Sequence, residues 1–322
     1  MSLGRNDPGE GYSLSRNPMP EKKEPLRVGG QAVIEGVMMR SPNSMAVAVR
    51  RPSGEIVVRR EGLNFFSEKK VWSKWPVVRG VITLISALVL GIRALNFSAN
   101  QSLAEEEKDP GAWTMSLTFV LALGFGIVLF FLLPLFLTKS LRFAIPLLNE
   151  SGLLFNLIDG ILRLLIFLAY LWGISFFKEI ERVFQYHGAE HKSIFAFESG
   201  RDLGVDQVKS FSYLHPRCGT SFLLVVMVVS IVVFAMIPHH LPFGYKVASR
   251  IVLIPFIAGF SYEIIRLADR KRDRRGVRYL IAPGLWLQRL TAREPTEAQI
   301  EVAIRALQEV LELEGRRTGR MA

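Results

Sequence analysis

Four runs of apolar residues dominate the chain, and each is long enough to cross a lipid bilayer. A membrane-spanning α-helix needs about 20 predominantly apolar residues. The four runs are Met115–Leu137, Leu154–Phe177, Thr220–Ile237 and Val247–Leu267. A chain of 322 residues has no room to bury four such helices in one soluble core. The sequence therefore predicts a mainly α-helical, polytopic membrane protein with about four transmembrane helices in contact with the lipid bilayer.

A fifth apolar segment, Val81–Ile92, is shorter and is bounded by Arg79 and Arg93. Its length favours an interfacial, re-entrant or packed helix over a crossing. Lysine and arginine are abundant both before this segment and after Leu267. The positive-inside rule then places both termini in the cytoplasm, which requires an even number of crossings. Four crossings satisfy that requirement, so we assign the fifth segment as non-spanning.

The soluble parts have patterns of their own. "SMAVAVRR" and "EIVVRREG", separated by "PSG", predict a β-hairpin. "PTEAQIEVAIRALQEVLELEGRR" predicts an amphipathic helix that Thr296 caps. The sequence thus divides into a disordered polar tail (1–24), a small β-rich cytoplasmic segment (25–75), an apolar interfacial or re-entrant helix with an acidic linker (76–113), transmembrane helices (114–268) that include a cytoplasmic His/Cys loop (178–219), and a basic cytoplasmic tail with an amphipathic helix (269–322).

The chain is basic, with a formal net charge of +11. This charge favours contact with anionic lipid headgroups and leaves room for a protein partner. Contact with nucleic acid or a ribosome has less support, because no aromatic residues interleave the basic run "DRKRDR" that starts at Asp269. The single cysteine excludes an intrachain disulfide, and hence a secreted disulfide scaffold.

The stretch "YHGAEHK" carries the first chemical signal. His187 and His191 are four residues apart, so they share one face of a helix. With Glu190 they form H-x-x-E-H, the pattern of the reversed zinc peptidases, in which the histidines bind metal and the glutamate handles protons. Two helical histidines can also simply pack beside aromatic rings, so this pattern needs support from the rest of the loop.

That support comes from "HPRCGTSF", which places His215 and Cys218 three residues apart. Imidazole and thiolate are the ligands that Zn²⁺ prefers, so the loop predicts a divalent metal site, with zinc as the first choice. If all four residues bind, the site is closed and structural. If three protein groups bind, a water occupies the fourth position and Glu190 is its general base. Glu35 and Glu263 are further candidates, the latter because it lies within an apolar run.

At these residues the chain resembles the YqhQ-like family of uncharacterised bacterial multi-pass membrane proteins, a domain of unknown function whose members are sometimes labelled predicted metal-dependent enzymes. The resemblance covers about residues 25–312 and rests on "VGGQAVIEGVMMR", "YHGAEHK", "HPRCGTSF", "GFSYEIIR" and "APGLWLQRLTAREPTEAQIEVAIRAL". It implies a location in the bacterial cytoplasmic membrane. It also points to Glu35, His187, Glu190, His191, His215, Cys218 and Glu263, but it supplies no reaction.

The leading functional hypothesis is a membrane-embedded, metal-dependent hydrolase of a peptide or ester substrate. Glu190 would be the catalytic base, and the histidines and the cysteine would hold the metal. The alternative is a non-enzymatic membrane scaffold or assembly factor in which a structural zinc ties the loop together. A transporter is the third hypothesis, and it would depend on Asp159 and Glu263 more than on His187.

Overall fold

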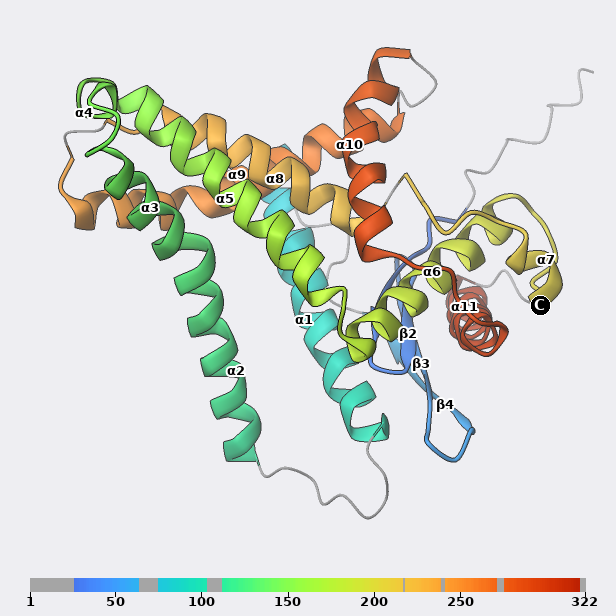
Figure 1. The fold of residues 1–322 in the computed structure, drawn as a ribbon. Helices are drawn as coiled ribbons and strands as arrows, with labels where there is room; N and C mark the ends of the chain where they lie inside the picture. Colours follow the sequence, from blue (N-terminus) through green and yellow to red (C-terminus); the bar gives the residue numbers. More distant parts are fainter. Residues whose placement is uncertain are drawn as a thin grey trace, which may run out of the picture.

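The computed structural model describes residues 26–63, 75–102, 112–216, 218–238, 241–270 and 275–318. These residues form an N-terminal antiparallel sheet and a larger set of helices (Figure 1). The predicted mainly helical class with a β-rich N-terminal segment is confirmed. The tail expected over 1–24, the acidic stretch 103–111 and the centre of the basic run at 271–274 lie outside the described residues.

The sheet is a meander whose strands pair in sequence order. The strands are β1 (Gly29–Val33), β2 (Gly36–Arg40), β3 (Ser44–Arg50) and β4 (Ile56–Gly62). The predicted hairpin is confirmed, because Val47 of β3 lies opposite Arg59 of β4. In the tight turn between β1 and β2, Glu35 has a φ of 51°, a left-handed backbone that residues other than glycine seldom adopt.

The two faces of the sheet pack against different helices, because successive side chains of a strand point to opposite faces. One face packs against α6 (Lys178–Glu198) and α11 (Glu297–Thr318). Its buried side chains include Val37, Met39, Ala46 and Ala48. The opposite face packs against α1 (Pro76–Ser102) through Leu90 and Ala94. The sheet is therefore enclosed between the first helix of the chain and the last.

The amphipathic helix α11 packs on the sheet through its apolar stripe, as its sequence pattern predicts. The buried members of the stripe are Ile300, Ala303, Ile304, Leu307 and Val310. Thr296 and Gln299 form a reciprocal cap: the Gln299 N–H donates to Thr296 Oγ1 (3.4 Å), and the Thr296 N–H donates to Gln299 Oε1 (2.9 Å). Burial of each large apolar side chain contributes about 1.5–3 kcal/mol, which holds the C-terminal helix on the N-terminal sheet.

The apolar helices form the second part of the molecule, on the left of Figure 1. They are α2 (Ala112–Ile127), the π-helical turn η2 (Val128–Leu132), α3 (Leu133–Leu141), the short α4 (Leu147–Glu150), α5 (Gly152–Ile174), α8 (Gly219–Ala235) and α9 (Phe243–Arg270). Within the described ranges, four segments are long and apolar enough to cross a membrane: Pro76–Ser102, Ser116–Leu141, Gly152–Ile174 and Ala248–Ala268. Large apolar side chains remain exposed along them, for example Leu121 and Val252. These spans indicate a membrane protein.

The segment Val81–Ile92 lies inside α1, which is 27 residues long and is one of the four candidate spans. The expectation of a short helix here is wrong, because the helix continues beyond both flanking arginines. The shorter apolar helix is α8, with 17 residues, which covers most of the predicted crossing Thr220–Ile237. The second half of α1 packs on the sheet through Leu90 and Ala94, so the length of the helix does not by itself show that it crosses the membrane. A non-spanning α1 and cytoplasmic termini therefore remain predictions.

The elements that carry the histidines and the cysteine are joined directly to apolar helices. Only residues 175–177 separate α5 from α6, and Cys218 immediately precedes α8. The short α7 (Val205–Lys209) follows α6, and α10 (Arg275–Thr291) follows α9. The chain leaving α10 passes α6, where the Arg293 N–H donates to the carbonyl of Phe184 (2.9 Å). The predicted loop therefore lies at the junction between the apolar helices and the sheet (Figure 1).

Candidate metal centre

Helix α6 places His187 and His191 on one face, and their ring centroids lie 4.3 Å apart. The helix runs without interruption through Gly188, although glycine costs about 1 kcal/mol relative to alanine inside a helix. Close packing explains this glycine. A Cβ added at Gly188 would lie 2.0 Å from the carbonyl oxygen of Arg293, so only glycine lets the segment after α10 approach α6. In "HGAEH", the two histidines are the candidate ligands, and the glycine between them allows the close packing against Arg293.

Cys218 is the third member of the site and is the N-cap residue of α8. Its Sγ lies 3.1 Å from Nε2 of His187 and 3.1 Å from the hydroxyl of Thr220, and it accepts the backbone N–H of Thr220 (3.4 Å). Among the described residues, His187, His191 and Cys218 offer ligand atoms that all lie within 4.8 Å of one another. The structure therefore brings together three of the four residues predicted to bind metal.

Main-chain carbonyls orient both imidazoles. Nδ1 of His187 lies 2.7 Å from the carbonyl of Thr291, and Nδ1 of His191 lies 2.5 Å from the carbonyl of Tyr213. A carbonyl only accepts, so each Nδ1 carries the proton and each Nε2 presents a lone pair. This is the usual arrangement of a metal-binding histidine, in which a hydrogen bond to one ring nitrogen leaves the other nitrogen free to bind the metal.

The donor set fits a cation better than it fits a protein hydrogen-bond network. Both Nε2 atoms are acceptors, while the Cys218 thiol has at most one proton to share between them. Nε2 of His191 is buried, and no donor in the described part of the chain bonds to it. One divalent cation would engage two imidazole lone pairs and one thiolate, the ligand types that Zn²⁺ prefers. The residues present therefore fit a metal ion, though they do not decide between zinc and another divalent ion.

The electrostatic environment favours the metal-binding protonation states. Burial lowers the pKa of His191 and so favours neutral imidazole, although the neighbouring Cys218 opposes this shift. Burial raises the pKa of the Cys218 thiol, but His191 and Thr220 lower it more, so the net shift is downward. The position of the sulfur at a helix N-terminus acts in the same direction. Neutral imidazoles and a thiolate are the forms that coordinate a metal.

Glu190 lies beside this group but is not part of it. It is only 6% exposed, and burial raises its pKa to about 8, while His187 lowers that pKa and Cys218 raises it. The backbone N–H of Gly30 in β1 bonds to the carboxylate. Oε2 has no hydrogen-bond partner within the described ranges. A buried carboxyl group with one uncommitted oxygen next to metal ligands is suited to accept and return a proton.

One glycine of "VGGQAVIEG", Gly30, has a packing role at this site that the sequence did not reveal. Gly30 lies within strand β1, where a Cβ would come 2.8 Å from Cγ of Glu190 and 2.8 Å from the carbonyl of Met38. Gly29 has nothing within 4 Å of such a Cβ. Gly30 thus allows the sheet edge to reach Glu190.

His215 lies beside the donor group with a different partner. Its Nε2 is 3.6 Å from Oε2 of Glu198, and its ring centroid lies 5.6 Å from that of His191. Gln288 holds its backbone on both sides: the His215 N–H donates to Gln288 Oε1, and Gln288 Nε2 donates to the His215 carbonyl, each at 2.8 Å. The four-ligand arrangement is not assembled in this structure.

The two other candidate carboxylates form ion pairs. Glu35 accepts two bonds of 2.5 Å from the guanidinium of Arg182 and a third from the Tyr186 hydroxyl (3.2 Å), which ties the sheet to α6. Glu263 of α9 makes a bidentate pair with Arg79 of α1, with distances of 2.6–3.0 Å. Neither belongs to the metal-donor group among the described residues.

Sequence reasoning missed the groups that orient the ligands. The carbonyls of Thr291 and Tyr213 belong to residues far from α6 along the chain, and every residue has a carbonyl. No sequence signal distinguishes them. The sequence also gives no signal for Gln288, because its hydrogen bonds to the His215 backbone depend on where α10 lies. Thr220 could have been found, since a threonine two residues after a helix-capping cysteine is a local feature.

Comparison with known proteins places the chain in a family. Residues 75–313 match the family model described as "Protein of unknown function (DUF1385)". The chain belongs to this family. It is also 36% identical over 309 residues to "Uncharacterized protein YqhQ" of Bacillus subtilis (strain 168), which covers 92% of this chain and 96% of that protein. No solved structure matches. The resemblance predicted from the motifs is confirmed, and the matched region contains His187, His191 and Cys218, the three candidate metal ligands.

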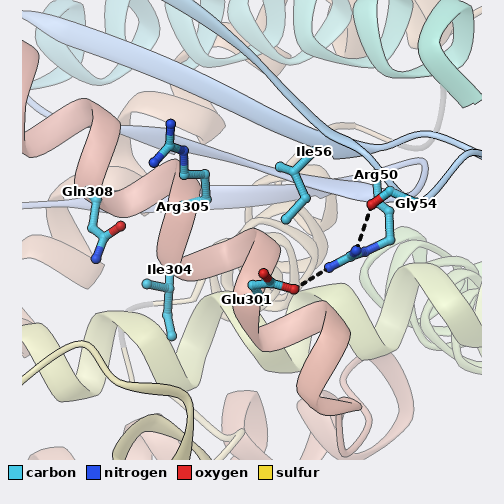
Figure 2. A pocket seen from close by; sticks show the side chains of 7 residues that line it. All are labelled: Arg50, Gly54, Ile56, Glu301, Ile304, Arg305 and Gln308. Atoms are coloured by element: carbon cyan, nitrogen blue, oxygen red, sulfur yellow. Dashed lines mark hydrogen bonds and ion pairs between the residues drawn. The ribbon is translucent and has the colours of Figure 1, made fainter.

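A separate surface hollow of about 490 Å³ lies between the sheet and α11 (Figure 2). Arg50 lines it and donates to the carbonyl of Gly54 (2.9 Å) and to Glu301 (2.6 Å). Arg305, on the same helix, pairs with Glu309 (2.9 Å). The charged side chains of this hollow form ion pairs with one another or with Glu309, and none of the three metal-donor residues lines it. The group of His187, His191 and Cys218 is therefore the stronger candidate for a functional site.

Proposed function

We propose that this protein is a membrane-bound, metal-dependent hydrolase that cleaves an amide or ester bond. His187, His191 and Cys218 hold one divalent cation, with zinc as the first choice. Glu190 acts as the general base. The observation that carries this proposal is the combination of three convergent donors with a buried carboxyl group that stays outside the donor set. Three protein ligands leave a coordination position open, which is typical of catalytic zinc.

Each residue has a distinct task in this mechanism. A bound divalent cation supplies Lewis acidity, which polarises a carbonyl and makes water more acidic. The carbonyls of Thr291 and Tyr213 keep both imidazoles turned toward the site. Glu190 takes a proton from the attacking water through its uncommitted Oε2 and returns it to the leaving group. Gly30 holds the other side of that carboxylate in place through its N–H.

A non-enzymatic scaffold with a structural zinc is the second candidate function. One observation favours it: the site joins α6, the start of α8 and, through the Thr291 carbonyl, the end of α10. A metal there would fasten three segments at the boundary of the apolar helices. This alternative gives Glu190 no task and gains from a fourth ligand, for which His215 is the nearest predicted candidate.

The test compares three proteins purified in detergent without chelators. Wild type, His187→Ala and Glu190→Gln are assayed for metal content and for hydrolysis of a panel of fluorogenic peptide and ester substrates. We expect wild type to carry about one metal ion per chain, His187→Ala to lose metal and turnover, and Glu190→Gln to keep metal and lose turnover. Wild type that stays metal-free after incubation with zinc would overturn the proposal, as would full turnover in Glu190→Gln.

A further inference from the structure

A second cluster of buried charge lies among the apolar helices, away from the residues of the metal centre. Asp159 and Arg163 of α5 and Arg250 of α9 are 1%, 8% and 6% exposed. Both guanidinium groups donate to the same oxygen, Oδ2 of Asp159, at 3.1 Å from Arg163 and 3.0 Å from Arg250. The sequence alone favours a neutral pair of Asp159 and Arg163. The structure adds a second arginine and leaves one positive charge in excess.

The other acidic residues of α5, α8 and α9 lie too far away to neutralise the excess. Helix α8 has no charged residue, and Asp159 is the only acidic residue of α5. Glu263 of α9 is thirteen residues beyond Arg250, about 20 Å along the helix axis, and pairs with Arg79. The phenyl rings of Phe131 and Phe234 lie 5.2–5.7 Å from the two guanidinium groups and offset the charge only in part.

Three polar atoms of the cluster remain without a hydrogen bond. They are Nε of Arg163, Nε of Arg250 and Oδ1 of Asp159, all buried and without a partner in the described part of the chain. Each guanidinium has several N–H donors and uses one of them within the cluster. An unpaired charge is costly inside a membrane, where ionisable residues commonly mark a functional site. The cluster therefore has both the charge and the free donors to bind an anion.

Its position suits a ligand that arrives at the membrane surface. Asp159 is seven residues from the start of α5, about 10 Å along the helix. Close to it, α5 and α8 pack tightly, because a Cβ added at Gly160 would lie 2.6 Å from Ile231. Ile251 and Val252, next to Arg250, are 60% and 74% exposed. The arginines thus lie one layer inside the lipid-facing surface, near one end of the apolar helices.

We propose that Asp159, Arg163 and Arg250 form a binding site for one phosphate group, either free phosphate or the phosphate of an anionic lipid headgroup. Guanidinium groups match the geometry of phosphate oxygens and bind them through paired N–H donors. Asp159 holds the two arginines at a common point and keeps the net charge at +1. This site is independent of the proposed hydrolase and uses none of its residues.

The test follows thermal unfolding of the full-length, delipidated protein in a neutral detergent. One arm adds inorganic phosphate against sodium chloride of equal ionic strength. The other adds phosphatidylglycerol against diacylglycerol, which lacks a phosphate. A rise of about 5 °C in the phosphate arm identifies a free anion, and a similar rise with phosphatidylglycerol alone identifies a headgroup. No rise in either arm overturns the proposal.

Substitutions give the result its specificity. Arg250→Gln removes the excess charge and leaves the pair of Asp159 and Arg163, so we expect the rise to disappear while the unfolding midpoint without ligand changes little. Arg266→Gln removes a positive charge from the same helix and should keep the full rise. An equal rise in Arg250→Gln and wild type would contradict the proposal. If Arg250→Gln does not fold, native mass spectrometry of wild type decides: the proposal requires a phosphate or phosphatidylglycerol adduct of one per chain, and its absence overturns it.

Discussion

Nε2 of His187 lies 3.1 Å from Sγ of Cys218, a residue that follows it by 31 positions and belongs to a different helix. The contact joins the end of one apolar helix, through α6, to the beginning of another. A single S–H···N bond would satisfy these two atoms but would leave Nε2 of His191 unpaired. A bound cation would engage all three donor atoms, whereas one proton can be shared by only two of them. Metal binding can therefore be tested by measuring affinity in variants of these residues.

The number of protein ligands can be read from two substitutions. Loss of a residue that only orients a metal ligand typically weakens metal affinity ~10–100-fold. We expect Cys218→Ser to weaken zinc affinity by more than this, because a thiolate ligand is lost. His215→Ala should keep affinity within about tenfold, because its imidazole faces Glu198 and not the donor group. Competition with a chromophoric chelator measures both. Equal losses would show that His215 is a fourth ligand and would favour the structural site.

Substitution with Co²⁺ provides a readout that does not depend on activity. The wild-type protein loaded with Co²⁺ should show a thiolate-to-metal absorption band, and Cys218→Ser should lack it while Glu190→Gln keeps it. The reason is that Cys218 lies among the donors and Glu190 does not. A band that survives in Cys218→Ser would remove the cysteine from the ligand set.

Gly30→Ala tests whether strand β1 positions the carboxylate. The new Cβ would lie 2.8 Å from both Cγ of Glu190 and the carbonyl oxygen of Met38, so the contact between β1 and Glu190 must shift, while the three metal-donor residues lie on other elements. We expect unchanged metal content and a turnover reduced at least ~10-fold. A correctly placed general base contributes ~100-fold or more, and a displaced Glu190 should lose a substantial part of that contribution. Gly29→Ala is the matched control, because its Cβ meets nothing within 4 Å. Identical behaviour of the two variants would remove Gly30 from the site.

Gly188→Ala should destabilise the protein although alanine is the better helix former. The added Cβ would meet the carbonyl oxygen of Arg293 at 2.0 Å, a main-chain atom that cannot move alone. Overpacking costs about 1–3 kcal/mol, and a main-chain contact at 2.0 Å places this case in the upper part of that range, above the ~1 kcal/mol that alanine gains in helix propensity. Thermal unfolding in detergent measures the change. Gly173→Ala in α5, with open space at its Cβ, should be neutral or stabilising; a similar loss there would show a general intolerance of alanine.

The contact between Glu314 and the strands should make stability depend on pH. Burial raises the pKa of Glu314, but hydrogen bonds from Ser41 and Asn43 outweigh it and lower the pKa below its ordinary value. A carboxylate with a lowered pKa stabilises the fold above its unfolded pKa, and this stabilisation is lost as the pH falls through the folded pKa. Glu314→Gln should therefore cost about 1–3 kcal/mol at pH 7 and little at pH 3.

Unfolding by denaturant at the two pH values measures this difference. The exposed pair of Glu297 and Lys209 supplies the control, since Glu297→Gln should leave stability nearly unchanged at either pH. A loss in Glu314→Gln that is the same at pH 3 and pH 7 would show that its hydrogen bonds, and not its charge, hold the sheet to α11.

The sequence predicted the features that depend on local periodicity. The hairpin of β3 and β4, the stripe that buries Leu307 and the helical pairing of His187 with His191 all follow from residues close together in the chain. Features that depend on distant partners were not predictable. The pairing of Glu263 with Arg79 joins residues far apart in the sequence, and the position of His215 depends on Gln288 of α10.

The length of α1 was underestimated for a related reason. A count of consecutive apolar residues stops at Arg79 and Arg93, but arginine is a good helix former, so the helix continues past both. Each arginine also pairs with an acidic residue, Arg79 with Glu263 and Arg93 with Glu61. Hydropathy alone does not include such partners. The candidate metal site could likewise be predicted only in part. Its histidines and cysteine form a recognisable sequence pattern, but the main-chain carbonyls that orient the imidazoles do not.

The three-residue link between α5 and α6, together with the capping of α8 by Cys218, fixes the position of the candidate metal site relative to these two apolar helices. His187 and His191 lie on a helix that follows α5 almost directly, and Cys218 caps the first turn of α8. In the described part of the chain, no long flexible segment joins these residues to the apolar helices, so the site cannot move far from them. For the proposed hydrolase, this placement predicts that only bonds presented at the ends of these apolar helices reach the site, so a substrate would be selected by its depth as well as by its chemistry.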